Sequence, residues 1–339
     1  MASTRPATLA TLARKLGLSV SSVSYALRNH PHTAESTKRR VLAAARELDY
    51  RPNAAVASLM GHIRRGRRPS AGASLAFVWV EATRAEARSD PFYRQVFSGA
   101  EERAAIHGFR LEQHWVREPV INPHRLCQVL RARGITGLVF SPCNHDTTVA
   151  LEWEWDDFAM AVIGNAPWPV ELHRAVHHHY AGMRTCLERA AEFGMKHCVA
   201  LIDETVNSRA GRAWEAAFAT FSAPCRTARN RMWLGSAEAI ADARAFVRKH
   251  QPDCVITSTP AFAPAAAVTS PSEGKPWWVV LNCALASVEF AGIDNDYAKI
   301  AANAVDLVIG QLHRNERGIP QDPKLLHFNG RWVGPKLSV

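Results

Sequence analysis

The sequence predicts a small all-α domain at the N-terminus, followed by an α/β region of doubly wound parallel sheets. Three observations support this prediction. Three short runs with helical apolar spacing fill residues 9–48, the net positive charge is confined to the first 70 residues, and apolar strand-like segments alternate with helical patterns from residue 75 onward. At 339 residues the chain is long enough for one small domain and one or two larger ones.

Residues 9–48 contain three helical patterns separated by short turns. The first pattern has apolar residues at i, i+3, i+4 and i+7: Leu9, Leu12, Ala13 and Leu16. Gly17 permits a tight turn, and Ser19 is a suitable N-cap for the second helix. The apolar faces of the second and third helices are Val23, Ala26 and Leu27, and then Val41, Leu42, Ala45 and Leu48. This order is the helix-turn-helix arrangement, whose second helix enters the major groove of DNA; the alternative is a small bundle with an accidental turn.

The outer face of the second helix consists of small hydroxyl side chains and one aromatic ring. At 100° per residue, Ser21 and Tyr25 point away from the buried face, with Val20 and Ser24 beside them. Small serine side chains let a helix approach the duplex closely, and their hydroxyl groups can bond to phosphates. This face is therefore the predicted DNA-reading surface.

The charge of the chain is unevenly distributed. Residues 1–70 hold 13 Lys and Arg against 3 Asp and Glu, a net charge of +10, whereas residues 71–339 hold 28 of each sign. A basic patch confined to one small domain is typical of polyanion-binding proteins. A merely solvated basic face would not be expected to stop at a composition boundary.

A short apolar helix and a basic linker follow, in the segment "RPNAAVASLMGHIRRGRRPSAGAS". Pro52 suits the first turn of a helix, and the run ends near Gly61. So short a helix is marginal alone in water, and its apolar residues therefore need a partner, which could be a second copy, DNA, or both. The arginine-rich stretch beyond it is typical of a poorly packed linker.

The segments "ATLATLARKLGLSVSSVSYAL" and "VLAAARELDYRPNA", with the "SL" that follows, closely resemble the headpiece of the LacI/GalR family of bacterial transcriptional repressors. The resemblance covers about residues 7–60. It implies that the helix after Pro52 is a hinge helix, that two copies pair in the minor groove, and that Leu59 is wedged between base steps. It also implies base contacts from Val20, Ser21 and Tyr25. Contacts to phosphates or groove walls are implied for Ser19, Ser22, Ser24 and Asn53.

The chain departs from this family at Tyr25, where relatives most often have Arg and sometimes His. A tyrosine cannot make the bidentate contact of arginine to guanine. We therefore expect the operator to differ from the common one of the family.

The rest of the chain alternates strand and helix patterns. Strands are predicted at "LAFVWV", "FRLEQHWV", "GLVFSP", "AMAVIG", "HCVALID", "DCVITS", "WWVVLN" and near Leu325–Phe328. Helices are predicted at Phe92–His107, Pro123–Arg133, "RTCLERAAEFG", "AWEAAFATF", "AIADARAFVRKH" and Tyr297–Leu312. The segment "IDNDYAKIAANAVDLVIGQL" resembles the effector domain of the LacI/GalR family, which implies a two-lobed periplasmic-binding-protein-like architecture with the ligand between the lobes.

Position within this resemblance suggests which residues contact an effector. The candidates are Phe92, Tyr93, Asn144, His178, Arg209 and Asn282. The alignment at Arg209 could slip to Arg212, and the aromatic residues could simply be packed in the core. His178 and Asn282 stand where many relatives have Asp, and Thr259 with Pro260 replaces a frequent Asn-Asp pair. A less acidic cleft favours a neutral saccharide or a sugar acid over a cationic ligand.

Other chemistry is weakly indicated. Seven cysteines without a Cys-x-x-Cys pair argue for a reducing compartment and against a zinc framework. The cluster His173, His177, His178 and His179 could suggest a metal, but clustered surface or cleft histidines are the preferred interpretation, and neither a metal nor another cofactor is predicted. No nucleophile elbow, phosphate-binding glycine loop or kinase signature is present, so the chain is not expected to be an enzyme. No signal peptide and no apolar run of membrane length is found.

The sequence thus predicts a homodimeric, ligand-responsive regulator of carbohydrate genes that acts as a repressor on a palindromic operator in double-stranded DNA. The expected location is the bacterial cytoplasm, at the nucleoid. The predicted domains are a DNA-binding domain at 1–51, a hinge helix and linker at 52–72, and an effector-binding and dimerisation domain at 73–339. Two alternatives remain open: a regulator controlled by a partner protein without a small effector, and a sugar-processing enzyme fused to a headpiece.

Overall fold

The computed structural model describes residues 9–27, 33–48, 73–117, 122–143, 154–221, 230–272, 274–283 and 290–335. The chain divides into two compact units, Met1–Gly72 with Ile309–Arg317, and Ala73–Val308 with Gly318–Val339. Each unit is described by itself. Within the described ranges, no helix combines the length and the apolar character needed to cross a lipid bilayer.

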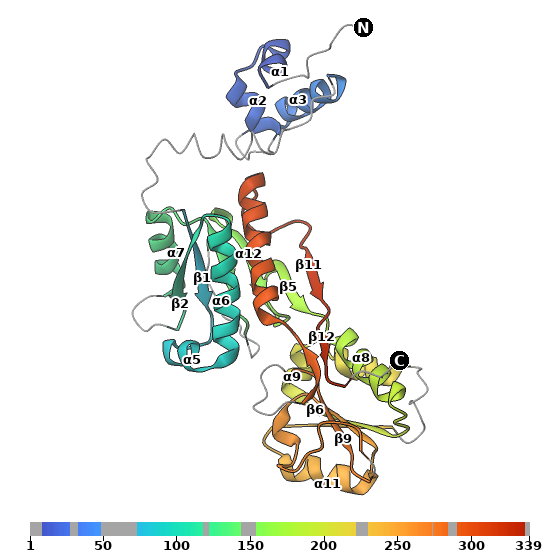
Figure 1. Cartoon of the computed structure of the whole chain (residues 1–339). Coiled ribbons are helices and arrows are strands. Elements are labelled where there is room, and N and C mark those ends of the chain that lie inside the picture. The colour runs from blue at the N-terminus through green and yellow to red at the C-terminus, as the bar shows by residue number, and fades with distance from the viewer. Residues whose placement is uncertain are drawn as a thin grey trace. The chain divides into compact units, whose positions relative to one another are not determined.

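The N-terminal unit contains the three predicted helices, α1 (Leu9–Leu16), α2 (Val20–Leu27) and α3 (Glu35–Glu47) (Figure 1). Their shared core is Leu12, Ala13, Val23, Ala26, Val41, Ala44 and Ala45. Gly17 has a φ of 65°, which lets the amide of Leu18 reach the carbonyl of Ala13 at 3.0 Å and closes the turn. The helix-turn-helix prediction is confirmed.

One apolar assignment in α3 is wrong. Leu42 is exposed, whereas Ala44 is buried. Measured from Val41, Leu42 lies 100° around the helix but Ala44 only 60°, so the stripe passes through the alanine. The volume of leucine therefore does not contribute to this small core.

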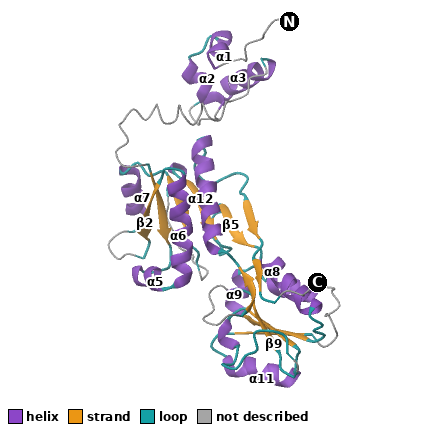
Figure 2. Ribbon diagram, viewed as in Figure 1, coloured by secondary structure: helices purple, strands orange, loops and turns teal. Residues whose placement is uncertain are grey.

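The second unit has two lobes, each built on a six-stranded sheet (Figure 2). The sheet of the first lobe is entirely parallel and has the order β11-β5-β4-β3-β1-β2. Its strands are β1 (Ser74–Trp79), β2 (Arg110–Trp115), β3 (Gly137–Phe140), β4 (Ala159–Ile163), β5 (His173–His177) and β11 (Leu325–Phe328). The helices connected to it are α5 (Arg84–Ser89), α6 (Pro91–Ile106), α7 (Pro123–Ala132), the short η1 (Trp155–Asp157) and α12 (Tyr297–Arg314).

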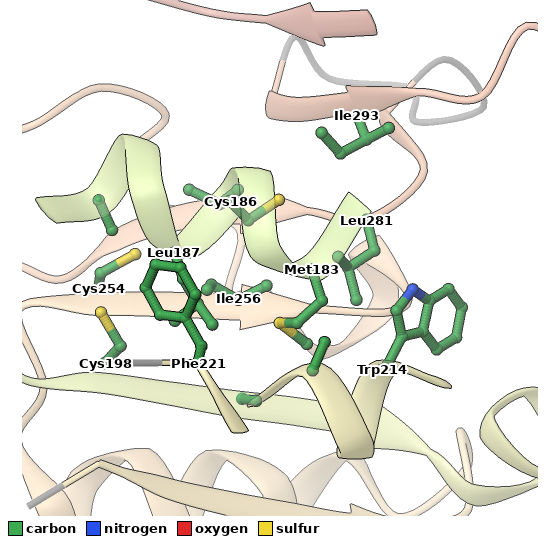
Figure 3. Close-up of a cluster of buried hydrophobic side chains, with 14 of the residues drawn as sticks. Met183, Cys186, Leu187, Cys198, Trp214, Phe221, Cys254, Ile256, Leu281 and Ile293 are labelled. Atoms are coloured by element: carbon green, nitrogen blue, oxygen red, sulfur yellow. The ribbon is translucent and has the colours of Figure 1, made fainter. Parts of the chain in front are cut away.

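The sheet of the second lobe has the order β12-β10-β9-β8-β6-β7 and is parallel except for β12. Its strands are β6 (Cys198–Asp203), β7 (Arg231–Gly235), β8 (Cys254–Thr257), β9 (Trp277–Val280), β10 (Ala291–Asp294) and β12 (Arg331–Val333). Its helices are α8 (His179–Glu192), α9 (Glu204–Arg209), α10 (Ala213–Thr220), α11 (Ile240–His250) and the short η2 (Pro260–Phe262). The core in Figure 3 joins Met183, Cys186 and Leu187 of α8 and Trp214 of α10 to the sheet.

The chain passes between the lobes at three places. These are the step from β5 to α8, the step from β10 to α12, and the step from β11 to β12. We call them the crossing segments, residues 177–179, 294–297 and 328–331. Since both lobes are doubly wound sheets connected by these segments, the α/β two-lobed prediction is confirmed.

Candidate functional site

The outward face of α2 carries large exposed side chains on a polar helix. Val20 and Tyr25 are each 44% exposed. Ser19 caps the helix, because its Oγ accepts the amide of Ser22 at 3.0 Å and also lies 2.8 Å from the hydroxyl of Ser22. The exposed positions on this face are available for contact with another molecule.

Ser24 differs from the predicted pattern. Its exposed fraction is 6%, so it lies at the margin of the core rather than on the outward face of α2. The side chain of Ser21 and the residues Asn53 and Leu59 lie outside the described part of the structure. Their DNA contacts remain predictions.

The cations of the headpiece exceed its carboxylates. Among the described residues of this unit before position 49, Glu47 pairs with Lys15 at 2.5 Å and Glu35 with Lys38 at 3.5 Å. Arg14, Arg39 and Arg40 are left without a carboxylate from that range. A positive potential at the surface of the three-helix unit follows, and it is suited to phosphate groups.

A second candidate site is centred on Tyr297 at the start of α12. The hydroxyl of Tyr297 accepts hydrogen bonds from the side-chain amides of Asn295 at 3.1 Å and Asn282 at 3.2 Å. The ring of Phe92, on α6, packs edge-on against the Tyr297 ring at 4.7 Å. The Tyr297 cluster, defined as Phe92, Asn282, Asn295 and Tyr297, therefore joins the first lobe, the second lobe and a crossing segment.

Local structure holds this cluster in place. Asp90 caps α6 by accepting the amide of Phe92 at 2.8 Å. Two turns later, a Cβ on Gly99 would lie 2.2 Å from the carbonyl oxygen of Ala298. Only glycine permits so close an approach of α6 to the start of α12.

Tyr93 occupies a different environment from its neighbour Phe92. It is buried in the first lobe with its ring edge-on to Trp79 at 5.5 Å. Burial raises the pKa of Tyr93, and the nearby carboxylate of Glu81 adds to the rise. The structure thus gives Tyr93 a packing position, and Phe92 alone of this pair reaches the Tyr297 cluster.

A cavity of about 880 Å³ is lined by residues of both lobes. Asn165, Arg174 and Lys324 line it from the first lobe, and Glu204 and Arg209 line it from α9 of the second. We call it the inter-lobe cavity. Its lining combines apolar surface with several charged side chains, which is suited to a hydroxylated or charged small molecule.

The structure distinguishes Arg209 from Arg212. Arg209 ends α9 and lines the inter-lobe cavity, and its charge is near enough to Tyr297 to oppose the rise that burial causes in the pKa of that phenol. Arg212 has a left-handed φ of 56° and forms ion pairs with Glu204 at 2.9 Å and Glu215 at 2.8 Å. Among these two arginines, only Arg209 contributes to the cavity wall.

His178 precedes α8 on a crossing segment. Its imidazole donates from Nδ1 to Oδ1 of Asn329 at 3.0 Å, and its ring lies edge-on to His327 at 4.9 Å. Burial lowers the pKa of His177 to about 4 and lowers that of His179 further below its usual value. Within the described ranges, no group of three or more His, Cys, Asp or Glu side chains is arranged to hold a metal ion.

Several polar atoms near these residues are buried and have no hydrogen-bond partner among the described residues. They are Oδ1 of Asn207, Asn282 and Asn295, and Oε2 of Glu204. All four are acceptors, and a buried acceptor without a donor is costly. The arrangement is suited to a ligand that supplies hydroxyl donors.

The sequence analysis did not identify Asn295, Tyr297 or Arg174 as site residues. The first two fall in "IDNDY", a segment already connected with the effector domain, so their place after a buried strand could have identified them. Asn144 lies outside the described residues.

The sequence was compared with protein-family models and with curated proteins. Residues 8–53 match the model of bacterial regulatory proteins of the lacI family. The transcriptional regulator AglR of Rhizobium meliloti (strain 1021) is 34% identical over 114 residues, which are 34% of this chain and 28% of that protein. The uncharacterised regulator YkvZ of Bacillus subtilis (strain 168) is 25% identical over 163 residues, 48% of this chain and 46% of that protein. The chain therefore spans less than half the length of these curated relatives.

Solved structures show the same fold over nearly the whole chain. The complex of the transcriptional regulator CelR with cellobiose matches with a TM-score of 0.55 and 15% identity, covering 96% of this chain and 98% of that one. The lac repressor dimer bound to operator and an anti-inducer matches with a TM-score of 0.52 and 17% identity, covering 97% and 98%. The relatives named here are transcriptional regulators, and residues 8–53 of this chain are similar to the lacI family of bacterial regulatory proteins.

Proposed function

We propose that this protein is a ligand-responsive, DNA-binding transcriptional regulator, a repressor of carbohydrate genes that binds a palindromic operator as a homodimer. The observation that carries the proposal is the outward face of α2, where Val20 and Tyr25 are exposed beside the Ser19 cap on a basic three-helix unit. A recognition helix needs such a face to reach base edges in the major groove. Two copies related by two-fold symmetry would read two half-sites.

The inter-lobe cavity supports the ligand-responsive part of the proposal. It is lined from both lobes, and Arg209 connects it electrostatically to the Tyr297 cluster. Among the residues that line the cavity, Glu204 has a buried carboxylate oxygen without a hydrogen-bond donor in the described part of the chain, and this oxygen can receive a ligand hydroxyl. The ligand class proposed is a saccharide or sugar acid, and it is consistent with the cellobiose bound by the regulator CelR.

The proposed domains are the helix-turn-helix at 1–51, the hinge helix and linker at 52–72, and the effector-binding and dimerisation region at 73–339. The hinge helix would pair with its symmetry mate in the minor groove, where Leu59 would unstack one base step. Because the proposed ligand is chromosomal DNA, the proposed place of action is the bacterial cytoplasm. No catalytic role is proposed for any residue.

The test of the DNA-binding proposal is selection of binding sites from random duplexes, followed by titration of the selected site at several salt concentrations. We expect a palindromic consensus and an affinity that falls linearly on log–log axes as salt rises, by about 0.9 per phosphate contacted. Tyr25→Ala should weaken the selected site far more than random DNA. Failure to enrich any site, or a complex insensitive to salt, would exclude the proposed function.

Occupancy mapping in the native host then identifies the regulated genes. Saturable ligand binding without turnover supports a small-molecule effector. Ligand turnover would instead favour the enzyme alternative. A protein that binds its operator but no small molecule would favour control by a partner protein.

A further inference from the structure

Arg174 is the one lysine or arginine among the described residues whose side chain is buried. It lies on β5, and its backbone is paired with Val162 of β4 and Leu325 of β11. The residue is 8% exposed and lines the inter-lobe cavity. Because strands on both sides fix the backbone of Arg174, its side chain starts from a rigid position at the wall of the cavity.

The hydrogen bonds of Arg174 are made to neutral acceptors. Its Nη1 donates to the carbonyl of Ala166 at 2.7 Å and to that of Gly164 at 3.4 Å. Within the described ranges, the one carboxylate that comes within 4 Å is that of Glu171, whose Oε2 is 3.9 Å from Nε and whose side chain is 73% exposed. The guanidinium is therefore desolvated without a close counter-charge.

Two partly buried arginines of the same chain are better paired than Arg174, which is more deeply buried. Arg103 forms a bidentate pair with Asp306 at 2.7 and 2.9 Å, and Arg131 approaches Asp157 at 2.7 Å. A buried charge is unfavourable unless it is paired and its donors are satisfied. Burial lowers the pKa of Arg174, which has the sign expected for an incompletely compensated cation.

A second cation stands beside Arg174 at the same wall. The carbonyl of Lys324 accepts the backbone amide of Arg174 at 2.8 Å, and the Lys324 side chain lines the cavity. From the second lobe, Arg209 lines the cavity too, whereas Glu204 is already paired with Arg212 at 2.9 Å. Among the described residues of the first lobe, the lining holds the two cations Arg174 and Lys324 against the one carboxylate of Glu171, so the charge of this wall is positive on balance.

We propose that Arg174 and Lys324 form a subsite for an oxyanion, and that the effector is an acidic saccharide whose carboxylate or phosphate binds there. The guanidinium fork of Arg174 matches a planar carboxylate or a phosphate, and Lys324 adds a second positive charge. The hydroxyl groups of the same ligand would meet the polar residues that line this cavity with Arg174, among them Asn165, Thr205 and Ser208. This inference rests on the proposed function, because it names the ligand class of the same cavity.

The test compares acidic saccharides with their neutral parents on the full-length protein at constant ionic strength. The probes are glucuronate, galacturonate, gluconate and glucose 6-phosphate, against glucose, galactose and cellobiose. Thermal shift finds the ligands, and isothermal titration measures Kd. We expect at least one acidic probe to stabilise the protein and to bind at least tenfold more tightly than its neutral parent. Comparing the carboxylate probes with glucose 6-phosphate then shows whether the subsite prefers a carboxylate or a phosphate.

Four variants separate charge from packing. Arg174→Gln removes the charge but keeps an amide that can donate to the Ala166 carbonyl, and it should raise the Kd of the acidic probe about 10- to 100-fold. Arg174→Lys should restore part of the affinity, and Lys324→Gln should raise the Kd by a smaller factor. Lys196→Gln is the matched control, because Lys196 is exposed on the second lobe and does not line the cavity.

Three results would overturn the inference: equal binding of neutral and acidic probes, an unchanged Kd in Arg174→Gln, or no stabilisation by any acidic probe. If Arg174→Gln does not fold, two other measurements test the oxyanion subsite. The Kd of the acidic probe should rise in Lys324→Gln, and it should rise in the wild type at high ionic strength; an unchanged Kd in both would overturn the inference. Operator binding by the wild-type chain is measured separately. Its failure would remove the proposed function, whereas a neutral ligand on an operator-binding protein would remove only the oxyanion subsite.

Discussion

Acidification should destabilise the α/β unit through His177. This imidazole is 4% exposed and packed between two glycines, since a Cβ on Gly182 would lie 3.1 Å from its Nε2 and a Cβ on Gly330 would lie 3.0 Å from its Cε1. Burial lowers the pKa of His177 from 6.5 to about 4, and the neighbouring His178 adds to the shift, whereas the carbonyl of Phe328 opposes it. Protonation in the folded state is therefore strongly disfavoured.

The sign and size of the effect follow from proton linkage. Well above pH 6.5 the imidazole is neutral in both states, so His177 adds no pH dependence there. Below that pH the unfolded chain takes up a proton that the folded chain refuses until about pH 4, and the free energy of unfolding falls over this window. Between pH 7 and pH 5.5 one such histidine should lower it by about 1.2 kcal/mol. His179, whose pKa is also lowered by burial, should act in the same direction.

The assay is urea unfolding followed by tryptophan fluorescence at pH 7, 6.5, 6 and 5.5. All ten tryptophans lie at or after position 79, so the signal reports on the α/β unit. His177→Gln is expected to lower the stability at pH 7 through imperfect packing, but to reduce the loss between pH 7 and 5.5 by about 1.2 kcal/mol. A slope in His177→Gln equal to that of the wild type would refute the reasoning.

Three further predictions concern base recognition by Tyr25, kinking of the operator by Leu59 and helix packing at Gly99. Tyr25→Arg should shift one position of each half-site toward guanine, with a discrimination of about 1–3 kcal/mol, and site selection that returned an unchanged consensus would exclude Tyr25 from the reading surface. Leu59→Ala should weaken operator binding and leave binding to random DNA nearly unchanged, because the wedge between base steps is lost; equal losses on both DNAs would make Leu59 a packing residue. Gly99→Ala should lower the free energy of unfolding of the α/β unit by about 1–3 kcal/mol, because the new Cβ would lie 2.2 Å from the carbonyl oxygen of Ala298. An unchanged midpoint of urea unfolding would contradict the close approach of α6 and α12.

Local apolar patterns were sufficient to predict the central strands. The runs that became β1, β4, β6 and β9 are almost wholly buried, and such runs are typical of parallel sheets covered on both faces. The strand β5 was missed because its sequence is "HRAVH", and two histidines and an arginine do not resemble a core strand. All five residues are nevertheless buried, because β11, about 150 residues later, covers that edge.

The candidate site was predicted only as far as local position allowed. Phe92, Arg209 and Asn282 reach the Tyr297 cluster or the inter-lobe cavity, whereas Tyr93 is packed in the first lobe. The choice between Arg209 and Arg212 depends on the left-handed backbone at Arg212, which turns that side chain toward Glu204 and Glu215. The burial of Arg174 depends on long-range pairing, so no local pattern could have indicated it.

The residues proposed to hold the ligand also determine how it could act on the rest of the molecule. Tyr297 and Asn295 lie on a crossing segment, and Arg174 and Arg209 line the same cavity from opposite lobes. A ligand bound to one lobe alone would have the same affinity in every arrangement of the lobes and would shift no equilibrium. An acidic ligand that pairs with Arg174 and also contacts Arg209 binds best where both cations are within reach, so it must favour one arrangement. The effect on operator affinity can then be no larger than the difference in ligand affinity between the two arrangements.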